Sequence, residues 1–505
     1  MRKFRIVIIT LSLVALIATP ALRAQEGEKP EKLKPHSYLP LETWLKRHKT
    51  AARVLSGVSN NVPPVPASED ITYATVSTPV RVNNDLLPPG GGAQAETQAE
   101  PYLAVNPENS DHLIAVYQES RFANGGARTL NYSVSFDGGA TWTEGILPGL
   151  TVASNGPWQR ASDPWVTFGP NNRVYYISLL FNQSTPDNAI GVSTSTDGGV
   201  TWGQPVEVFR STLDFNDKES IVADAYPGSP HFGNVYAAWD INKSVNGQFR
   251  HQELVVARST NGGSHWGKPK RIRKKGANIG VIPRVGPDGT VYAVWGGGPL
   301  NGSRFVIYFS KSTNGGRKWS TPAELADIIF DEIPNVRGGE FLVSFDVNPV
   351  NGDLFIAWQD ARFTGIGQAS LIISRNDGQT WSSPQRISDG PDDSPAFTVS
   401  VAANRQGHLA VSYYSFQNDP QRSFFADKYV RISRDGGQTF EPGLRITPQS
   451  FDIRAASQAG GFFLGDYVGL AGTESGFQLL WVGTDLESLI NPSRRQPDVF
   501  TASVQ

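Results

Sequence analysis

The sequence predicts an all-β fold, a propeller built from four-stranded sheets, and three observations support this prediction. The 505-residue chain contains 51 Gly and 35 Pro but no Cys and one Met, which is typical of many short strands joined by tight turns. One short motif recurs six times along the chain. Short apolar stretches separated by turn residues surround each copy, which is the pattern of one propeller blade.

The first 24 residues are predicted to be an export signal. Three cations, Arg2, Lys3 and Arg5, precede an apolar run over residues 6–18, and Ala24 is the expected residue before the cleavage site. The apolar run is shorter than the roughly 20 residues that a membrane-spanning helix needs, which disfavours an uncleaved anchor. We therefore expect a secreted or periplasmic protein that does not span a membrane after cleavage.

The remaining chain divides into an extension and a propeller. Residues 25–71 are predicted to be a polar extension with one short helix over residues 41–47, and residues 72–505 are predicted to form the propeller. Without cysteine, packing alone must hold the exported fold. The net charge of −2 argues against nucleic-acid binding, which needs a basic face, and we expect a monomer.

The recurring motif has the form Ser-x-Asp/Asn-x-Gly-x-x-Trp/Phe. Its Asp or Asn can accept backbone N–H groups within its own turn, its glycines supply positive φ, and its aromatic ring can pack against the turn. These properties predict a structural fastener of a hairpin, without a catalytic role. The six copies lie at residues 135–142, 195–202, 259–266, 312–319, 374–381 and 433–440.

Counting the expected strands favours seven blades over six. A seventh unit, with expected strands at 466–470, 477–482 and 498–504, has no motif and lacks a fourth strand. Residues 79–82 resemble the fourth strands that follow the motifs, such as residues 205–208. We therefore expect this N-terminal strand to complete the last blade and close the ring, which hides both exposed sheet edges.

The motif is that of the Asp box, or bacterial neuraminidase repeat, and residues 72–505 resemble the sialidase-like propeller superfamily. The resemblance implies that each Asp box lies between the third and fourth strands of a blade, on the face away from the active site. Candidate site residues are therefore expected where first strands begin and second strands end, because these points share the opposite face of an antiparallel blade.

Carboxylates recur at these positions and supply the candidate site. They could crowd around one mouth, where they would supply a general acid and base for glycoside cleavage or recruit a cation. Alternatively, each acid pairs with neighbouring backbone or with an arginine and is purely structural. We expect no cofactor beyond such a cation. The catalytic candidates are Glu100, Asp163, Glu340 and Asp466, and the substrate-binding candidates are Tyr102, Arg121, Trp165, Glu219, Arg284, Asp360, Arg362 and Tyr467.

The resemblance to active sialidases fails at particular residues. Their first blade opens on Arg-Ile-Pro, whereas this chain has Ala99 at the arginine position. Arg121 matches a later arginine of the family, but no acid follows it in the stretch 122–126. No tyrosine nucleophile can be assigned from the candidates Tyr413, Tyr414 and Tyr467. A mouth rich in acids would also repel an anionic sugar.

These observations leave three functions open. The first is an exported propeller that binds or hydrolyses glycans, with a neutral or cationic ligand favoured over sialic acid, because aromatic side chains stand beside the acids. The second is a non-enzymatic scaffold or recognition module, since fold alone does not fix function. The third is an exo-sialidase whose arginine site has been rebuilt from Arg121, Arg284 and Arg362.

Overall fold

The computed structural model describes residues 74–246, 248–421, 423–484 and 496–505. The predicted export signal, the extension and its helix at residues 41–47 lie outside the described residues. The described chain is almost entirely β, with two short 3-10 turns, η2 (Val152–Ser154) and η3 (Ile453–Ala455). Within this part of the chain, no helix has the length and apolar character needed to cross a membrane.

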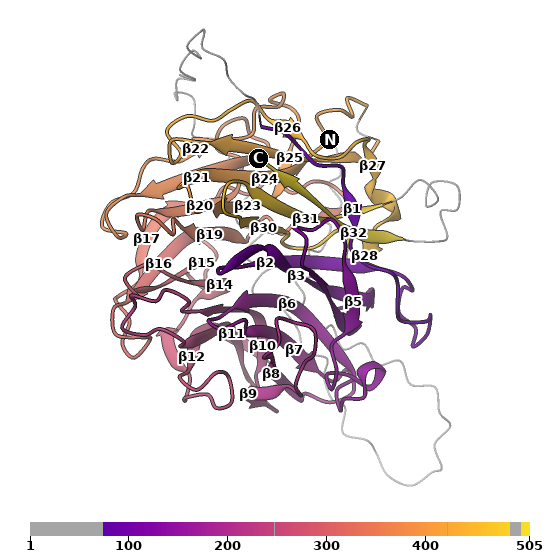
Figure 1. Ribbon diagram of the computed structural model, residues 1–505, viewed down its shortest axis with the longest axis vertical. Coiled ribbons are helices and arrows are strands. Elements are labelled where there is room, and N and C mark those ends of the chain that lie inside the picture. Colours follow the sequence, from indigo (N-terminus) through magenta and orange to yellow (C-terminus); the bar gives the residue numbers. More distant parts are fainter. Residues whose placement is uncertain (1–73, 247, 422, 485–495) are drawn as a thin grey trace.

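The strands form four-stranded antiparallel units that repeat along the chain (Figure 1). Units 1 and 2 join into one larger sheet through the single pair Ala127 and Ala161. The units are as follows: unit 1, β2 (Gln98–Asn106), β3 (Asn109–Arg121), β4 (Ala127–Ser135) and β5 (Thr143–Ile146); unit 2, β6 (Arg160–Phe168), β7 (Val174–Phe181), β8 (Asn188–Ser195) and β9 (Val206–Ser211); unit 3, β10 (Phe215–Ala223), β11 (Val235–Val245), β12 (Gln248–Ser259) and β13 (Lys270–Arg273); unit 4, β14 (Ala277–Val285), β15 (Val291–Gly298), β16 (Val306–Ser312) and β17 (Ala323–Asp327).

Units 5 to 7 have the same strand order as units 1 to 4, and a few short strands lie outside the four-stranded units. They are unit 5, β19 (Val343–Val347), β20 (Leu354–Asp360), β21 (Gln368–Ser374) and β22 (Gln385–Arg386); unit 6, β23 (Ala396–Ala403), β24 (Leu409–Ser415), β25 (Phe425–Ser433) and β26 (Leu444–Arg445); unit 7, β30 (Gly469–Gly472), β31 (Phe477–Thr484), β32 (Pro497–Val504) and β1 (Val80–Arg81); and the extra strands β18 (Val336–Arg337), β27 (Phe451–Asp452), β28 (Ser457–Gln458) and β29 (Phe462–Phe463).

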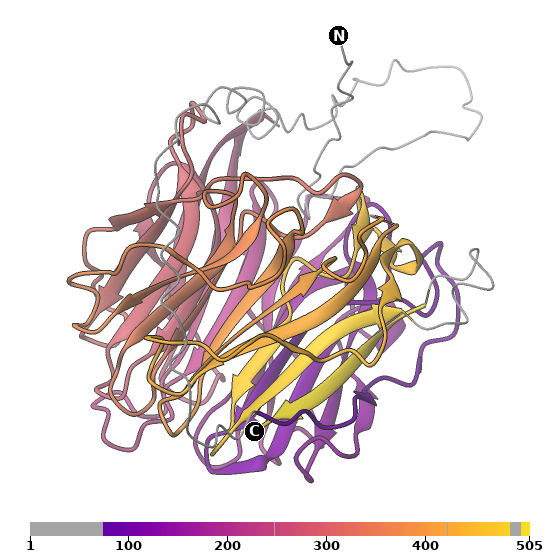
Figure 2. The same ribbon diagram turned by 90° about the horizontal axis from the view of Figure 1, so that it is seen from above.

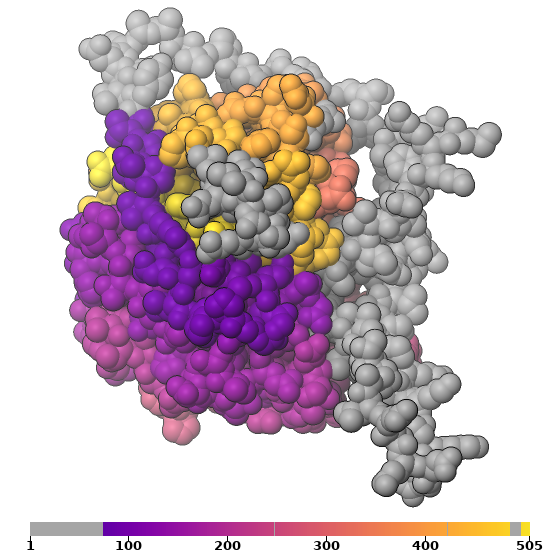
Figure 3. Space-filling view, turned by 90° about the vertical axis from the view of Figure 1, so that its right-hand side faces the viewer, coloured from indigo at the N-terminus to yellow at the C-terminus, as the bar shows by residue number. Residues whose placement is uncertain are grey.

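The units close into a ring around a common centre. The first strand of each unit packs against the first strand of the next, and β30 of unit 7 packs against β2 of unit 1. β1 pairs antiparallel with β32, with Val80 opposite Thr501, so the N-terminal strand completes unit 7 as the sequence predicted. Figure 2 shows the indigo N-terminal segment beside the yellow C-terminal strands, and indigo and yellow atoms adjoin on the surface in Figure 3.

The second strands carry much of the core. Their aromatic side chains are buried between neighbouring sheets, and truncating one such ring typically costs about 3–5 kcal/mol. The tryptophans among them are Trp239, Trp295, Trp358 and Trp481.

The Asp boxes form the predicted hairpin turns. In the first box, Asp137 accepts the backbone N–H of Thr141 at 2.9 Å and the Thr141 hydroxyl at 2.6 Å. Gly138 and Gly139 take φ of 70° and 89°, and the indole of Trp142 donates to the Gly139 carbonyl at 3.0 Å. The box lies between β4 and β5, at the end of the unit opposite the start of β2. We call the end where the first strands begin the mouth face.

Candidate functional site

A repeated β-bulge positions the site at the start of the first strands. In units 1 to 3, two residues of the first strand oppose one residue of the second, and the first bulged residue has positive φ. Glu100, Asp163 and Lys218 occupy this position with φ of 52°, 51° and 47°. Such strained, non-glycine bulges commonly aim a side chain at a functional site.

The bulge corrects one expectation from the sequence. Glu219 was predicted to be the counterpart of Glu100 and Asp163, but the register makes Lys218 their counterpart and places Glu219 one residue later. The reason is that Ser220 opposes Ala238 as Tyr102 opposes Val116. A single residue of register moves a side chain to the other face of a strand.

Lys218 joins acids from three other units at the centre of the ring. Its ammonium lies 3.1 Å from Glu100, 2.8 Å from Asp163 and 2.7 Å from Asp466. All four side chains are buried. Burial alone would lower the pKa of Lys218, but the three carboxylates raise it well above its usual range. The ammonium therefore stays charged and holds units 1, 2 and 7 to unit 3.

A second cation reaches the same acids from outside the repeat. Arg337, on β18, donates to both carboxylate oxygens of Asp466, at 2.8 and 2.5 Å. β18 pairs in parallel with β29, and no repeated motif signalled it. Lys218 and Arg337 are thus site residues that were not predicted from the sequence. The available signal was Lys218 itself, a basic residue at a strand start where units 1, 2 and 7 carry acids.

The pKa values of two neighbouring acids are driven apart. Burial, reinforced by Asp163, raises the pKa of Glu100 to about 7. Burial would also raise the pKa of Asp466, but Arg337 and Lys218 hold it well below its usual range. Since both carboxylates contact the Lys218 ammonium, their contacting oxygens lie no more than about 6 Å apart. One group is thus ready to give up a proton near neutrality while its neighbour stays ionised.

Arg121 stands beside this cluster and has no carboxylate partner among the described residues. Its guanidinium donates to Gln118 and lies 4.3 Å from the centre of the Phe463 ring, and that of Arg337 lies 4.6 Å from the same ring. Burial lowers the pKa of Arg121 to about 10. Gln118 in turn donates to Glu100 at 2.5 Å, so Arg121 is linked to the cluster through an amide.

Further buried acids surround Lys218 on unit 3. Asp217 and Asp240 oppose each other across β10 and β11, and burial raises the pKa of both, as it does that of Glu219. Neither carboxylate oxygen of Glu219 has a hydrogen-bond partner among the described residues. Within those residues, no group of three His, Cys, Asp or Glu side chains has the arrangement of a metal site. The cation predicted as an option at the mouth therefore remains a prediction.

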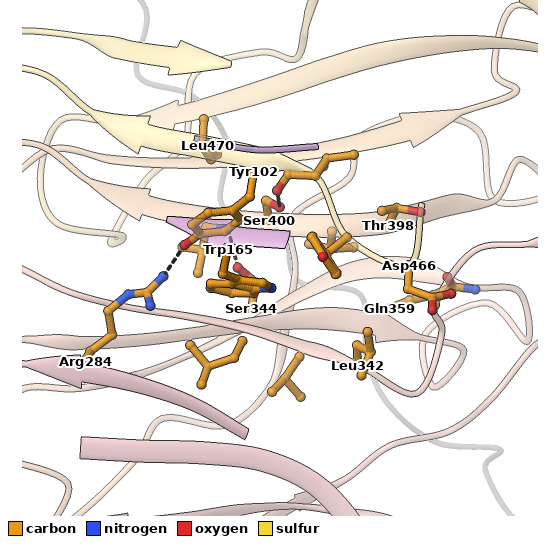
Figure 4. A pocket seen from close by; sticks show the side chains of 17 residues that line it. Tyr102, Trp165, Arg284, Leu342, Ser344, Gln359, Thr398, Ser400, Asp466 and Leu470 are labelled. Carbon is orange, nitrogen blue, oxygen red and sulfur yellow. Dashed lines mark hydrogen bonds between the residues drawn. The ribbon is translucent and has the colours of Figure 1, made fainter. Parts of the chain in front are cut away.

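A pocket lies along the centre of the ring, beside the charged cluster (Figure 4). We call it the axial pocket, because its walls come mainly from first strands. Tyr102 and Trp165 stack in it with ring centres 3.8 Å apart, and Tyr467 lies 5.5 Å from Trp165. The side chains labelled in Figure 4 are Tyr102, Trp165, Arg284, Leu342, Ser344, Gln359, Thr398, Ser400, Asp466 and Leu470.

The charged groups that line the axial pocket are already paired. Arg284 lies 3.1 Å from Asp346 and donates to the Tyr102 hydroxyl at 2.8 Å. Asp466 is held by Lys218 and Arg337. By contrast, the side-chain oxygen of Gln359 is buried and has no hydrogen-bond partner among the described residues. The pocket thus offers aromatic surface and a free acceptor without an uncompensated charge.

The structure separates other predicted residues from this centre. Asp360 pairs with Arg362 at 2.8 Å and accepts the indole N–H of Trp358, and neither lines the axial pocket. Glu340 is buried beside Arg337, and burial raises its pKa to about 7. Arg121, Arg284 and Arg362 contact different side chains, namely Gln118, Asp346 and Asp360, and the rebuilt arginine triad remains a prediction. At the centre, Lys218 and Arg337 share Asp466, and Arg121 lies beside them. The mouth is therefore less acidic in sum than the sequence indicated.

No family model and no curated protein matches the chain. Solved structures that it resembles include the Hadza microbial sialidase Hz136, with 15% identity and a TM-score of 0.45 over 74% of this chain and 73% of that chain. A Penicillium chrysogenum alpha-L-arabinanase complexed with arabinobiose has 14% identity and a TM-score of 0.46, over 67% and 94%. A protein of unknown function from Dyadobacter fermentans has 12% identity and a TM-score of 0.45, over 86% and 100%. Likenesses this distant carry no argument about activity.

Proposed function

We propose that the axial pocket binds a neutral glycan. The observation that carries this proposal is the pairing of its charged lining groups, Arg284 with Asp346 and Asp466 with Lys218 and Arg337. A charged ligand would have to break the half-buried Arg284–Asp346 pair or the buried pairs of Asp466, and stranding a buried charge typically costs several kcal/mol. A neutral ligand leaves both pairs intact.

The remaining lining suits a sugar. Pyranose and furanose rings present apolar C–H faces that pack on aromatic rings such as Trp165 and Tyr467, while convergent polar groups fix orientation in a mostly apolar pocket. Gln359 lines the pocket, and its side-chain oxygen is buried without a partner among the described residues, so a rotation of this side chain would bring an acceptor to a sugar hydroxyl. This pairing of aromatic surface with an unused acceptor supports a sugar over a purely apolar ligand.

A glycan array with the purified protein tests this proposal, followed by titration of the strongest neutral binder. We expect Trp165→Ala to weaken binding about tenfold or more, because an aromatic contact is worth about 0.5–1.5 kcal/mol beyond its burial. Phe136→Ala, at an exposed aromatic on an Asp box, is the control and should leave affinity unchanged. Absence of binding to every neutral glycan would refute the proposal and favour a scaffold or recognition module.

Hydrolysis of the bound glycan is a second candidate, favoured by the opposed pKa shifts of Glu100 and Asp466. Retaining glycosidases place two carboxyl groups about 5–5.5 Å apart, one as a general acid and the other as a nucleophile. In this reading, Glu100 donates its proton to the leaving oxygen as the glycosidic bond breaks, Asp466 stabilises the positive charge at the sugar, and a water then adds to the sugar carbon and returns a proton to Glu100. Release of reducing sugar that is lost in Glu100→Gln, with glycan affinity retained, would support it; binding without turnover would exclude it.

A further inference from the structure

The outer edge of unit 3 carries a dense run of cations. Residues 268–275 read Lys-Pro-Lys-Arg-Ile-Arg-Lys-Lys, with six cations and no acid, in a chain whose net charge is −2. Lys268, Lys270, Lys274 and Lys275 are exposed. We call residues 268–275 the basic strip.

The strip is held in an extended form on the wall of the propeller. Its central part is β13, which pairs with β12 alone and leaves its other edge unpaired. Ile272 is buried and anchors the strand in the core of units 3 and 4. The four residues of β13 are extended and span roughly 13 Å. The cations therefore form a linear array rather than a compact cluster.

The array leads from the wall toward the mouth face. Lys270 lies opposite Val256, and Arg273 lies opposite Leu254, nearer the start of β12. The chain then passes through Lys274 and Lys275 into Gly276, whose carbonyl accepts the N–H of Gln252. Figure 1 shows β12 at the outer edge of the molecule.

Most of this charge is uncompensated within the described residues. Arg271 pairs with Glu253 at 3.3 Å, and Arg273 stacks over Tyr308, 4.5 Å from the ring centre. The four lysines of the strip have no ion pair in the described part of the chain. Unpaired cations that lie close together repel one another. An anionic polymer that binds them neutralises this repulsion and releases counterions.

We infer that the basic strip binds a linear acidic polysaccharide, one that bears carboxylates or sulfates along its length. A membrane surface would call for an exposed apolar group among the cations, but the one apolar side chain of β13, Ile272, is buried. Single-stranded nucleic acid would call for a free aromatic platform, but Tyr308 is covered by Arg273, and Trp266, two residues before the strip, packs against the hydrophobic core. A flexible polyanion needs neither an exposed apolar group nor a free aromatic ring beside the cations. This site is separate from the axial pocket.

The test uses the full chain and fluorescently labelled polygalacturonate, a linear polyuronate, with binding followed by anisotropy at several NaCl concentrations. We expect affinity that falls as salt rises, and a roughly tenfold or greater loss when all four lysines are changed to Gln. The double variant Lys274→Gln/Lys275→Gln should lose part of the affinity. Its matched control is Arg317→Gln/Lys318→Gln, an adjacent exposed pair on an Asp box, which should bind like the unchanged protein.

Several results would overturn the inference. These are no binding of polygalacturonate by the unchanged protein at low salt, equal losses in the two double variants, or tighter binding of duplex DNA or of anionic phospholipid vesicles than of polygalacturonate. Neutral dextran serves as the uncharged reference polymer. Trp165→Ala should leave polygalacturonate affinity unchanged, so failure of this inference and failure of the proposed pocket function give different results.

Discussion

Lys218 gathers three acids at the point where first strands of different units meet. The acids were predictable from the sequence because they recur at strand starts, and Glu100, Asp163 and Asp466 do come together. Lys218 was not predictable, because the β-bulge shifts the register by one residue. In the sequence, Glu219 therefore takes the position that matches Glu100 and Asp163. Bulges depend on backbone conformation, here φ of 47° at Lys218, and leave no clear mark in residue type.

Lys218→Met should destabilise the protein by about 3–5 kcal/mol at pH 8, because it leaves the buried carboxylates of Glu100 and Asp163 without their cation, while Asp466 keeps Arg337. The deficit should shrink at pH 5. Without the ammonium, the pKa of Glu100, already raised by burial, rises further above the unfolded value of about 4.3, so the folded variant binds an extra proton there and gains stability as pH falls. Urea unfolding of both proteins at pH 5 and 8 measures this. A loss that is independent of pH would contradict it; Asp163→Asn added to Lys218→Met should recover part of the loss.

Lys428 is also a buried cation but, unlike Lys218, it contacts no acid among the described residues. Its Nζ has no hydrogen-bond partner among the described residues and lies 4.5 Å from the centre of the Tyr414 ring. Burial lowers the pKa of Lys428 well below its usual range. The unfolded chain binds this proton up to about pH 10, so this residue destabilises the fold near neutrality, and its penalty lessens as pH rises.

Lys428→Met should therefore stabilise the protein at pH 7, by on the order of 2 kcal/mol, because it replaces a desolvated amine by an apolar chain of similar length. Urea unfolding at pH 7 and pH 10 checks both the gain and its decrease at the higher pH. Lys318→Met, at an exposed site, should change stability by less than about 0.5 kcal/mol. A destabilised Lys428→Met variant would show that the ammonium has a partner in solution.

At the scale of the elements, the Asp-box hairpin was the most predictable part of the molecule. Its determinants are local: the Asp137 carboxylate, the glycines with positive φ and the Trp142 indole all act within eight residues. β18, β28 and β29 were not predicted, because each is only two residues long; β28 and β29 form a tight local hairpin, whereas β18 pairs with β29 from a distant part of the sequence. Arg337 enters the site on one of them.

Asp137→Ala should cost about 1–3 kcal/mol in the free energy of unfolding, because it leaves the Thr141 N–H and hydroxyl without their acceptor. Affinity for a neutral glycan should not change, since the box lies at the end of unit 1 opposite the mouth face. Unfolding by urea and glycan titration on the same sample separate the two effects. Asp111→Ala, at a nearby exposed aspartate, is the control, and a loss of glycan affinity in Asp137→Ala alone would contradict the assignment of the box to structure.

At the scale of the whole molecule, closure of the ring joins the two ends of the described chain. The sequence indicated it because residues 79–82 resemble a fourth strand while the last unit lacks one. The Val82 N–H donates to the Val499 carbonyl at 2.8 Å, and Thr75 and Ser77 make further backbone bonds to residues 503–505. What the sequence could not supply is which side chains meet in the middle, because that depends on the relative rotation of units far apart in the chain.

Val82→Pro should destabilise the whole propeller rather than one unit. Val82 is 1% exposed, and proline removes the N–H that bonds to Val499, so β1 should detach at a cost of about 3 kcal/mol or more. Val82→Ala keeps the N–H and should lose only about 1–2 kcal/mol of packing. Detachment would also expose the edge of β32, which favours pairing with a second copy. We therefore expect Val82→Pro, and not Val82→Ala, to form oligomers in light scattering below its urea midpoint. Equal midpoints and equal scattering for the two variants would mean that the ring holds together without its N-terminal strand.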